Sequence, residues 1–181
     1  MSRPRIVLVS LLVTSLLAVA YPASAAIRAG RLAIGDSVMK AATTQLKNRG
    51  FRIVDTATSR QFSQADDRIR YWRSRGKLPR NVVVHLGNNG YIYDGDCARA
   101  VKAAGAGRTI FLVTVKVPRR WQAPNNRRLR DCASRFARAR LIDWYGYSKG
   151  HGAWFYSDGY HLTPTGRAKY ASFIAGKVAA A

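Results

Sequence analysis

From residue 31 onward, short apolar segments alternate with longer segments whose apolar positions have helical spacing. The short segments predict β-strands at 31–34, 51–55, 81–86, 108–115 and 140–143. The longer segments predict helices at 38–49, 64–75, 94–104, 125–138 and from 164 onward. The third strand carries consecutive rather than alternating apolar residues, which is typical of a strand covered on both faces. This alternation predicts the α/β class, in a three-layer α/β/α fold with about five parallel strands and helices on both faces.

The first 25 residues have the composition of a secretory signal peptide. Arg3 and Arg5 make a basic start, residues 6–20 are uncharged and mostly apolar, and Ala23-Ser24-Ala25 fits a cleavage site. The apolar run is short for a transmembrane helix, and an uncleaved anchor is the alternative. No later segment is apolar enough to span a membrane. We therefore expect a secreted, periplasmic or cell-envelope protein in which residues 26–181 form one domain.

Cys97 and Cys132 are the only two cysteines of the chain. In the oxidising compartment that export implies, we expect them to form a disulfide, with two buried free thiols as the alternative. The bridge would close a loop of about 35 residues, long enough to restrict the unfolded chain appreciably. Because no cluster of histidines accompanies the cysteines, the sequence does not indicate a zinc site.

The chain is strongly basic, with 31 Lys and Arg against nine acidic residues and a formal net charge of +22. Loss of the signal segment would remove only Arg3 and Arg5 from this excess. Such a charge attracts polyanions, and export favours anionic cell-envelope polymers as partners. Nucleic acid is less favoured, because the basic residues are scattered and no zinc-finger or RNA-recognition signature occurs. A solvated cationic surface without a dedicated partner is the alternative.

Three polar stretches lie where a parallel sheet places functional residues, beyond the carboxyl ends of its strands. Ser37 follows the first predicted strand, Asn89 follows the third, and Asp158 and His161 precede the last helix. Each stretch taken alone has a simpler explanation, namely a helix cap, an Asn-Gly turn or polar loop residues. Their convergence at one edge of the sheet favours a shared chemical role.

The chemistry of these residues is that of an activated serine. A spacing of three residues lets the Asp158 carboxylate reach one imidazole nitrogen of His161, which leaves the other nitrogen to take a proton from Ser37. The Asn89 amide can donate to the developing oxyanion. His85, at a strand end, and His151, in a loop, are less suited to be the catalytic base.

These stretches resemble three signature blocks of the SGNH (GDSL-type) hydrolase superfamily: Gly35-Asp36-Ser37, Gly87-Asn88-Asn89-Gly90 and Asp158-Gly159-Tyr160-His161. The resemblance covers nearly the whole chain after the signal segment. It is closest to the extracytoplasmic SGNH domains linked to membrane acyltransferases, including those of peptidoglycan O-acetyltransferases. Further segments resemble that branch: Thr58-Ser59-Arg60-Gln61, Val117-Pro118-Arg119-Arg120-Trp121 with Asn125, and Ile142-Asp143-Trp144.

The resemblance implies a flavodoxin-like fold and a role for each site residue. Ser37 would be the nucleophile, His161 the general base and acid, and Asp158 the residue that orients His161. The oxyanion donors would be the N–H of Ser37, the side chain of Asn89 and the N–H of Ser59, which stands where the family has a glycine. The Asp that usually follows Asn89 is absent, as suits the acyltransferase-linked branch. This serine mechanism calls for no metal or cofactor.

Three functions follow as hypotheses. The first is a secreted serine esterase that hydrolyses acyl esters, most simply O-acetyl groups, on a small ester or on a cell-envelope or extracellular glycan. The second is an O-acyltransferase that moves an acetyl group onto a cell-wall glycan, with a separate protein delivering the acyl donor. The third is a non-catalytic module that binds polyanions. The aromatic residues toward the end of the chain are expected in the core rather than on sugar rings: Trp121, Trp144, Trp154, Phe155 and Tyr156.

Overall fold

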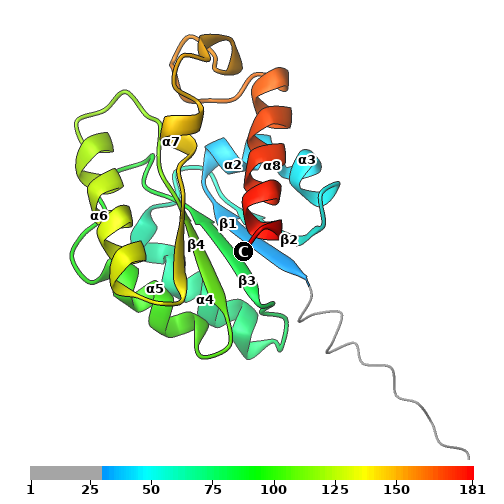
Figure 1. Cartoon of the computed structure of the whole chain (residues 1–181), viewed down its shortest axis with the longest axis vertical. Helices are drawn as coiled ribbons and strands as arrows, with labels where there is room; N and C mark the ends of the chain where they lie inside the picture. The colour runs from blue at the N-terminus through cyan, green and yellow to red at the C-terminus, as the bar shows by residue number, and fades with distance from the viewer. Residues whose placement is uncertain (1–29) are drawn as a thin grey trace, which may run out of the picture.

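The computed structural model describes residues 30–181, which form a five-stranded parallel sheet with helices on both faces (Figure 1). The strands are β1 (Arg31–Gly35), β2 (Phe51–Thr56), β3 (Asn81–His85), β4 (Thr109–Val113) and β5 (Ala139–Ile142). Their order is β2-β1-β3-β4-β5, the flavodoxin-like order. The predicted three-layer α/β class is confirmed.

The helices divide between the two faces of the sheet (Figure 1). One face is covered by α4 (Ala65–Ser74), α5 (Asp96–Ala104) and α6 (Gln122–Arg135). The other face is covered by α2 (Ser37–Ala41), α3 (Thr43–Lys47), α7 (Trp144–Tyr147) and α8 (Pro164–Ala179). Each face of the sheet has its own hydrophobic core, and neighbouring residues of one strand belong to different cores. In β1, Leu32 and Ile34 face the first set of helices and Ala33 faces the second. Burial on both sides explains the consecutive apolar residues of the strands.

The strand order places a topological switch point between β1 and β3. The chain leaves β1 toward β2 on one side of the sheet, and β3 then pairs with β1 on the other side. Open α/β sheets bind their ligands in the crevice outside such a point, beyond the carboxyl ends of the strands. The residues that follow β1 and β3 are therefore the first place to look for a site.

The helix predicted over 38–49 is instead two short helices, α2 and α3, interrupted at Ala42. The Thr43 hydroxyl donates a hydrogen bond to the carbonyl oxygen of Lys40 at 2.8 Å. A side chain that bonds a carbonyl three residues back competes with the helical backbone pattern. The apolar positions of this segment are buried, as their spacing predicted, but the Thr43 hydrogen bond coincides with the break between the two helices.

The segment 144–163, expected as a long loop, contains α7 and a 3₁₀ turn, η2 (Gly152–Trp154); a second such turn, η1 (Phe62–Gln64), precedes α4. Trp144, Trp154 and Phe155 are buried in the core beneath α8, as predicted, and the Trp144 and Trp154 rings stack with centroids 6.0 Å apart. Two residues differ from that expectation: half of the surface of Tyr156 is exposed, and Trp121 is only partly buried and belongs to neither core cluster.

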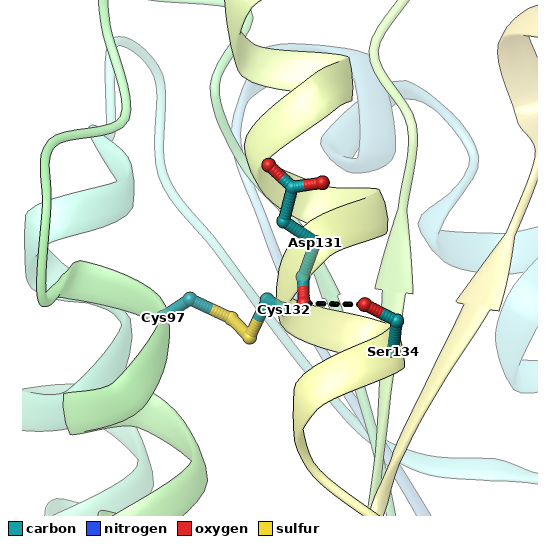
Figure 2. The surroundings of a disulfide bond; sticks show 4 residues. All are labelled: Cys97, Asp131, Cys132 and Ser134. Atoms are coloured by element: carbon teal, nitrogen blue, oxygen red, sulfur yellow. Dashed lines mark hydrogen bonds between the residues drawn. A yellow bond between two sulfur atoms is a disulfide. The ribbon is translucent and has the colours of Figure 1, made fainter.

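The predicted disulfide joins Cys97 of α5 to Cys132 of α6, across a sequence separation of 35 residues (Figure 2). Both residues pack against the core on the α4–α6 face of the sheet. The adjacent turn of α6 carries Asp131 and Ser134, whose hydroxyl donates to the Asp131 carbonyl oxygen at 2.9 Å. The bridge therefore ties two neighbouring helices of one layer together.

Removing this bridge with the double substitution Cys97→Ala and Cys132→Ala is expected to lower the free energy of unfolding by about 3–4 kcal/mol, because the unfolded chain regains the entropy of a long loop. Chemical denaturation under non-reducing conditions measures the change. Reductant should produce a similar loss in the unsubstituted chain and leave the double variant unaffected. Equal stability of the two proteins without reductant would contradict the prediction.

The predicted signal peptide, residues 1–25, lies outside the part of the chain that the structure describes. Its cleavage and the boundary of the following domain stay predictions. Within residues 30–181, none of the helices combines the length and the apolar character needed to cross a bilayer.

Candidate active site

Three residues from opposite ends of the chain form a chain of hydrogen bonds at the carboxyl edge of the sheet. The Oγ of Ser37 lies 2.9 Å from Nε2 of His161, and Nδ1 of His161 lies 2.7 Å from Oδ2 of Asp158. An ionised carboxylate only accepts hydrogen bonds, so Nδ1 carries the proton that points to Asp158. In the neutral imidazole, Nε2 is then the acceptor for the Ser37 hydroxyl. This is the arrangement that a histidine needs to remove a proton from serine.

The Asp158–His161 turn is held by its own backbone. Oδ1 of Asp158 accepts hydrogen bonds from the backbone N–H of Tyr160 at 3.0 Å and of His161 at 2.9 Å, while Oδ2 faces the imidazole. Directly afterward the Thr163 hydroxyl caps α8, and Pro164 occupies its first turn. The capped start of α8 lies two residues after His161 and so holds the turn in place.

These hydrogen bonds also set the charge of Asp158. Partial burial opposes ionisation, but the bonds from the backbone of Tyr160 and His161 and from the His161 side chain outweigh it and lower the pKa of Asp158. The carboxylate therefore stays ionised at neutral pH, where it can stabilise an imidazolium at His161.

Asp36 links the serine turn to the segment after β3. Its Oδ1 accepts the N–H of Val38 at 3.0 Å and so caps α2, which begins at Ser37. Its Oδ2 accepts the side-chain amides of Asn88 at 2.9 Å and of Asn89 at 3.2 Å. No sequence signal indicated the contact with Asn88, because Asp36 and Asn88 are 52 positions apart in the chain. The Asn89 amide nitrogen also donates to the carbonyl oxygen of Arg60, at 3.5 Å, so a reacting oxygen would replace this longer contact while the bond to Asp36 is kept.

Burial raises the pKa of Asp36 to about 6, against the hydrogen bonds that favour its charged form. Asp36 therefore binds its proton more tightly in the folded state than in the unfolded state. The stabilisation that this difference provides is complete below pH 3.8 and is lost as the pH rises through about 6. The free energy of unfolding of the natural chain, minus that of Asp36→Asn, is expected to fall by about 3 kcal/mol over this range.

Urea denaturation of both proteins between pH 4 and 7 tests this expectation. The other acidic residues contribute equally to both proteins, so their effects cancel in the difference. Asn also lacks the second carboxylate oxygen of Asp36 as an acceptor, but this loss changes stability by an amount that does not depend on pH. A difference that stays constant across the range would contradict it.

The segment after β2 completes the edge of the site. Ser59 has φ = 60°, a left-handed conformation that a glycine adopts without strain and other residues rarely adopt. This fits the position at which the SGNH family has a glycine. Next to it, Arg60 is nearly buried, and its guanidinium donates to the carbonyl oxygens of Asp55 at 2.6 Å and Gly35 at 3.3 Å. The Arg60 carbonyl oxygen faces the amide nitrogen of Asn89 at 3.5 Å.

Arg60 is thus held between three segments of the site, and sequence reasoning gave it no role. Its partner Asp55 also accepts hydrogen bonds from Arg68 and from the indole of Trp72. Burial opposes the charge of Asp55, but the bonds from Trp72, Arg68 and Arg60 prevail and lower its pKa. The ion pair fixes the loop that carries Ser59 relative to the ends of β1 and β2.

The other two histidines of the chain, His85 and His151, make no hydrogen bond to Ser37, His161 or Asp158. His85 is fully buried, its Nδ1 lies 2.8 Å from the hydroxyl of Tyr170, and burial lowers its pKa to about 3. His151 is exposed and stacks on Trp154. Both lie as the sequence predicted. Among residues 30–181, no cluster of three or more His, Cys or Asp side chains is arranged to hold a metal ion.

The sequence is similar to part of several named bacterial proteins. The chain is 32% identical over 136 residues to a putative peptidoglycan O-acetyltransferase of Bacillus subtilis, a match that covers 75% of this chain and 21% of that protein. It is 31% identical over 144 residues to the peptidoglycan O-acetyltransferase OatA of Listeria monocytogenes, covering 79% and 23%. The chain therefore spans about a fifth of the length of these relatives. No protein-family model matches it.

Solved structures show the same fold. The C-terminal catalytic domain of OatA from Streptococcus pneumoniae, determined with a methylsulfonyl adduct, superposes with a TM-score of 0.74 at 24% identity and covers 83% of this chain and 93% of that one. A carbohydrate esterase of family 3 from Talaromyces cellulolyticus gives 0.63 at 15% identity and covers 83% and 97%.

The flavodoxin-like sheet and the three blocks at its edge define an SGNH-type catalytic domain. The chain has an SGNH-hydrolase-like fold, and the homologues it matches are named peptidoglycan O-acetyltransferases. The resemblance found in the sequence is confirmed.

Proposed function

We propose that this chain is an O-acyltransferase that moves an acetyl group onto a hydroxyl of a cell-envelope glycan through an acyl-Ser37 intermediate. The observation that carries the proposal is the hydrogen-bond chain from Ser37 through His161 to Asp158. The names of the homologues favour transfer to peptidoglycan over the hydrolysis that the sequence alone put first.

The first half of the reaction would acylate the serine. Nε2 of His161 takes the Ser37 proton as Oγ attacks the carbonyl carbon of an acetyl ester, and the tetrahedral oxyanion is stabilised by the Ser37 N–H, the Asn89 amide and the Ser59 N–H. The intermediate collapses, the bond to the donor alcohol breaks, and His161 returns the proton to that alcohol.

The second half would release the acetyl group. His161 removes a proton from the incoming hydroxyl, which attacks the acyl carbon, and the proton passes to Ser37 as its ester bond breaks. A glycan hydroxyl gives transfer, whereas water gives free acetate, so an esterase would use the same residues. Asp158 holds the tautomer of His161 in both halves.

Export supports the choice of substrate. The predicted signal segment and the disulfide both suit an oxidising, extracytoplasmic compartment, which is where a cell-envelope glycan is found. The excess of basic residues would also favour contact with anionic envelope polymers.

Product analysis tests transfer against hydrolysis. The full chain is incubated with an activated acetyl ester, with and without a soluble N-acetylglucosamine oligosaccharide. The products are then separated and identified by mass spectrometry. We expect O-acetylated oligosaccharide that depends on Ser37. Free acetate as the only Ser37-dependent product would instead assign an esterase, and polyanion binding without any Ser37-dependent turnover would leave only a binding module.

A further inference from the structure

We propose that Tyr91, Tyr93 and Trp121 form a subsite that stacks on the sugar rings of the glycan acceptor. We call these three residues the aromatic row. The inference rests on the proposed function for its ligand, a strand of neutral N-acetylated sugars.

The aromatic row is continuous with the candidate active site. The ring centroids of Tyr91 and Trp121 are 6.1 Å apart, and those of Tyr91 and Tyr93 are 6.4 Å apart. Tyr91 is two residues beyond Asn89, so their Cα atoms are within about 7 Å of each other. The indole N–H of Trp121 donates to the carbonyl oxygen of Asn88 at 3.3 Å, which fixes its ring beside the same loop.

The backbone beneath the row is held in place before any ligand binds. The N–H of Ile92 donates to Asn125 Oδ1 and the N–H of Tyr93 to Asp96 Oδ2, both at 2.8 Å. The Asn125 amide in turn donates to the carbonyl oxygens of Gly87 and Gly90. A loop that is already ordered loses little conformational freedom on binding, which favours affinity.

The rings themselves remain available on this fixed loop. Tyr93 is 62% exposed, and Tyr91 and Trp121 are half-buried, unlike the fully packed Trp144 in the core. Core packing therefore does not account for Tyr93. Tyr and Trp combine an apolar ring with a polar group that stays hydrated, and they supply much of the binding energy at recognition surfaces. The faces of sugar rings carry C–H groups that match such rings, while the sugar hydroxyls remain free for hydrogen bonds.

A binding measurement tests the subsite apart from catalysis. Full-length protein with Ser37→Ala serves as the parent, and its affinity for an N-acetylglucosamine tetramer is measured by ligand-observed NMR. Adding Tyr93→Ala is expected to weaken binding about tenfold, because the sugar loses one of the rings on which it stacks. Tyr93→Phe, which keeps the ring, should restore most of the affinity.

Tyr71→Ala is the matched control. Its half-buried ring lies on α4, where the guanidinium groups of Arg68 and Arg75 cover it, and the substitution should not alter the affinity. Thermal unfolding of each variant checks that the fold is intact. Equal affinity of the parent and Tyr93→Ala, or no binding by the parent at millimolar tetramer, would overturn the proposal.

The two proposals fail separately. If the parent binds the tetramer through Tyr93 but the natural chain releases only acetate, the subsite stands and transfer is wrong. If the natural chain acetylates the tetramer but Tyr93→Ala binds it as well as the parent does, transfer stands and the subsite is wrong.

Discussion

Replacing Ser37 by alanine is expected to lower the release of acetate from an activated ester at least about 100-fold, because no other group then forms the acyl-enzyme. The oxyanion donors would remain, so a small residual rate over the uncatalysed reaction is expected. Initial rates of acetate release by the two purified proteins measure the effect. Labelling with a serine-reactive fluorophosphonate, followed by mapping of the modified peptide, should place the adduct on Ser37.

Ser134→Ala is the control for this measurement. Ser134 is an exposed serine on α6 beside the disulfide, and its hydroxyl bonds a backbone carbonyl of its own helix (Figure 2). The Ser134→Ala variant should release acetate at the rate of the natural chain, and Ser134 of the natural chain should carry no adduct. If Ser37→Ala kept the full rate, an acyl-Ser37 mechanism would be excluded whatever the acceptor.

The second large effect is expected at Asn89. Loss of one preorganised oxyanion donor costs about 100- to 1,000-fold in kcat, because the donor acts on charge that develops only in the transition state. Asn89→Ala should therefore lower kcat to this extent with little change in KM for a small ester. Steady-state kinetics with the ester measure both parameters.

Asn88 provides the comparison, because its amide shares the same acceptor oxygen of Asp36 but is buried. Asn88→Ala is expected to act through the fold and to lower the free energy of unfolding by about 1.5–3 kcal/mol, the contribution of one hydrogen bond to a charged group. Urea denaturation separates the two variants. An Asn89→Ala protein with full kcat, or one whose loss of activity matches a loss of folded protein, would refute its role as an oxyanion donor.

The placement of the site explains why short, separate stretches of sequence can cooperate. Ser37 and Asn89 follow β1 and β3, which are neighbours in the sheet although a whole β-α unit separates them in sequence. His161 is brought to the same edge by α8, which packs on the face shared with α2 and α3. The parallel arrangement makes all the carboxyl ends of the strands meet there.

The sequence by itself determined the class of fold and the segments that carry the chemistry. The period of apolar residues identifies strands and helices because each element must bury one face or both, and this constraint is local. It placed five strands within a few residues, and the signature blocks around Ser37, Asn89 and His161 indicated the SGNH-hydrolase-like fold. The cysteine pair and the core positions of Trp144 and Trp154 were also predictable from composition and residue type.

The tertiary structure alone decided how residues distant in sequence meet. The contacts of Asp36 with Asn88 and Asn89, and of the Arg60 guanidinium with Gly35 and Asp55, depend on which strands pair and how closely their loops pack. No periodicity encodes such contacts, because each side chain is also compatible with a solvated loop. The pKa of Asp36 is likewise a property of the packed edge of the sheet, where burial and its hydrogen-bond partners act together.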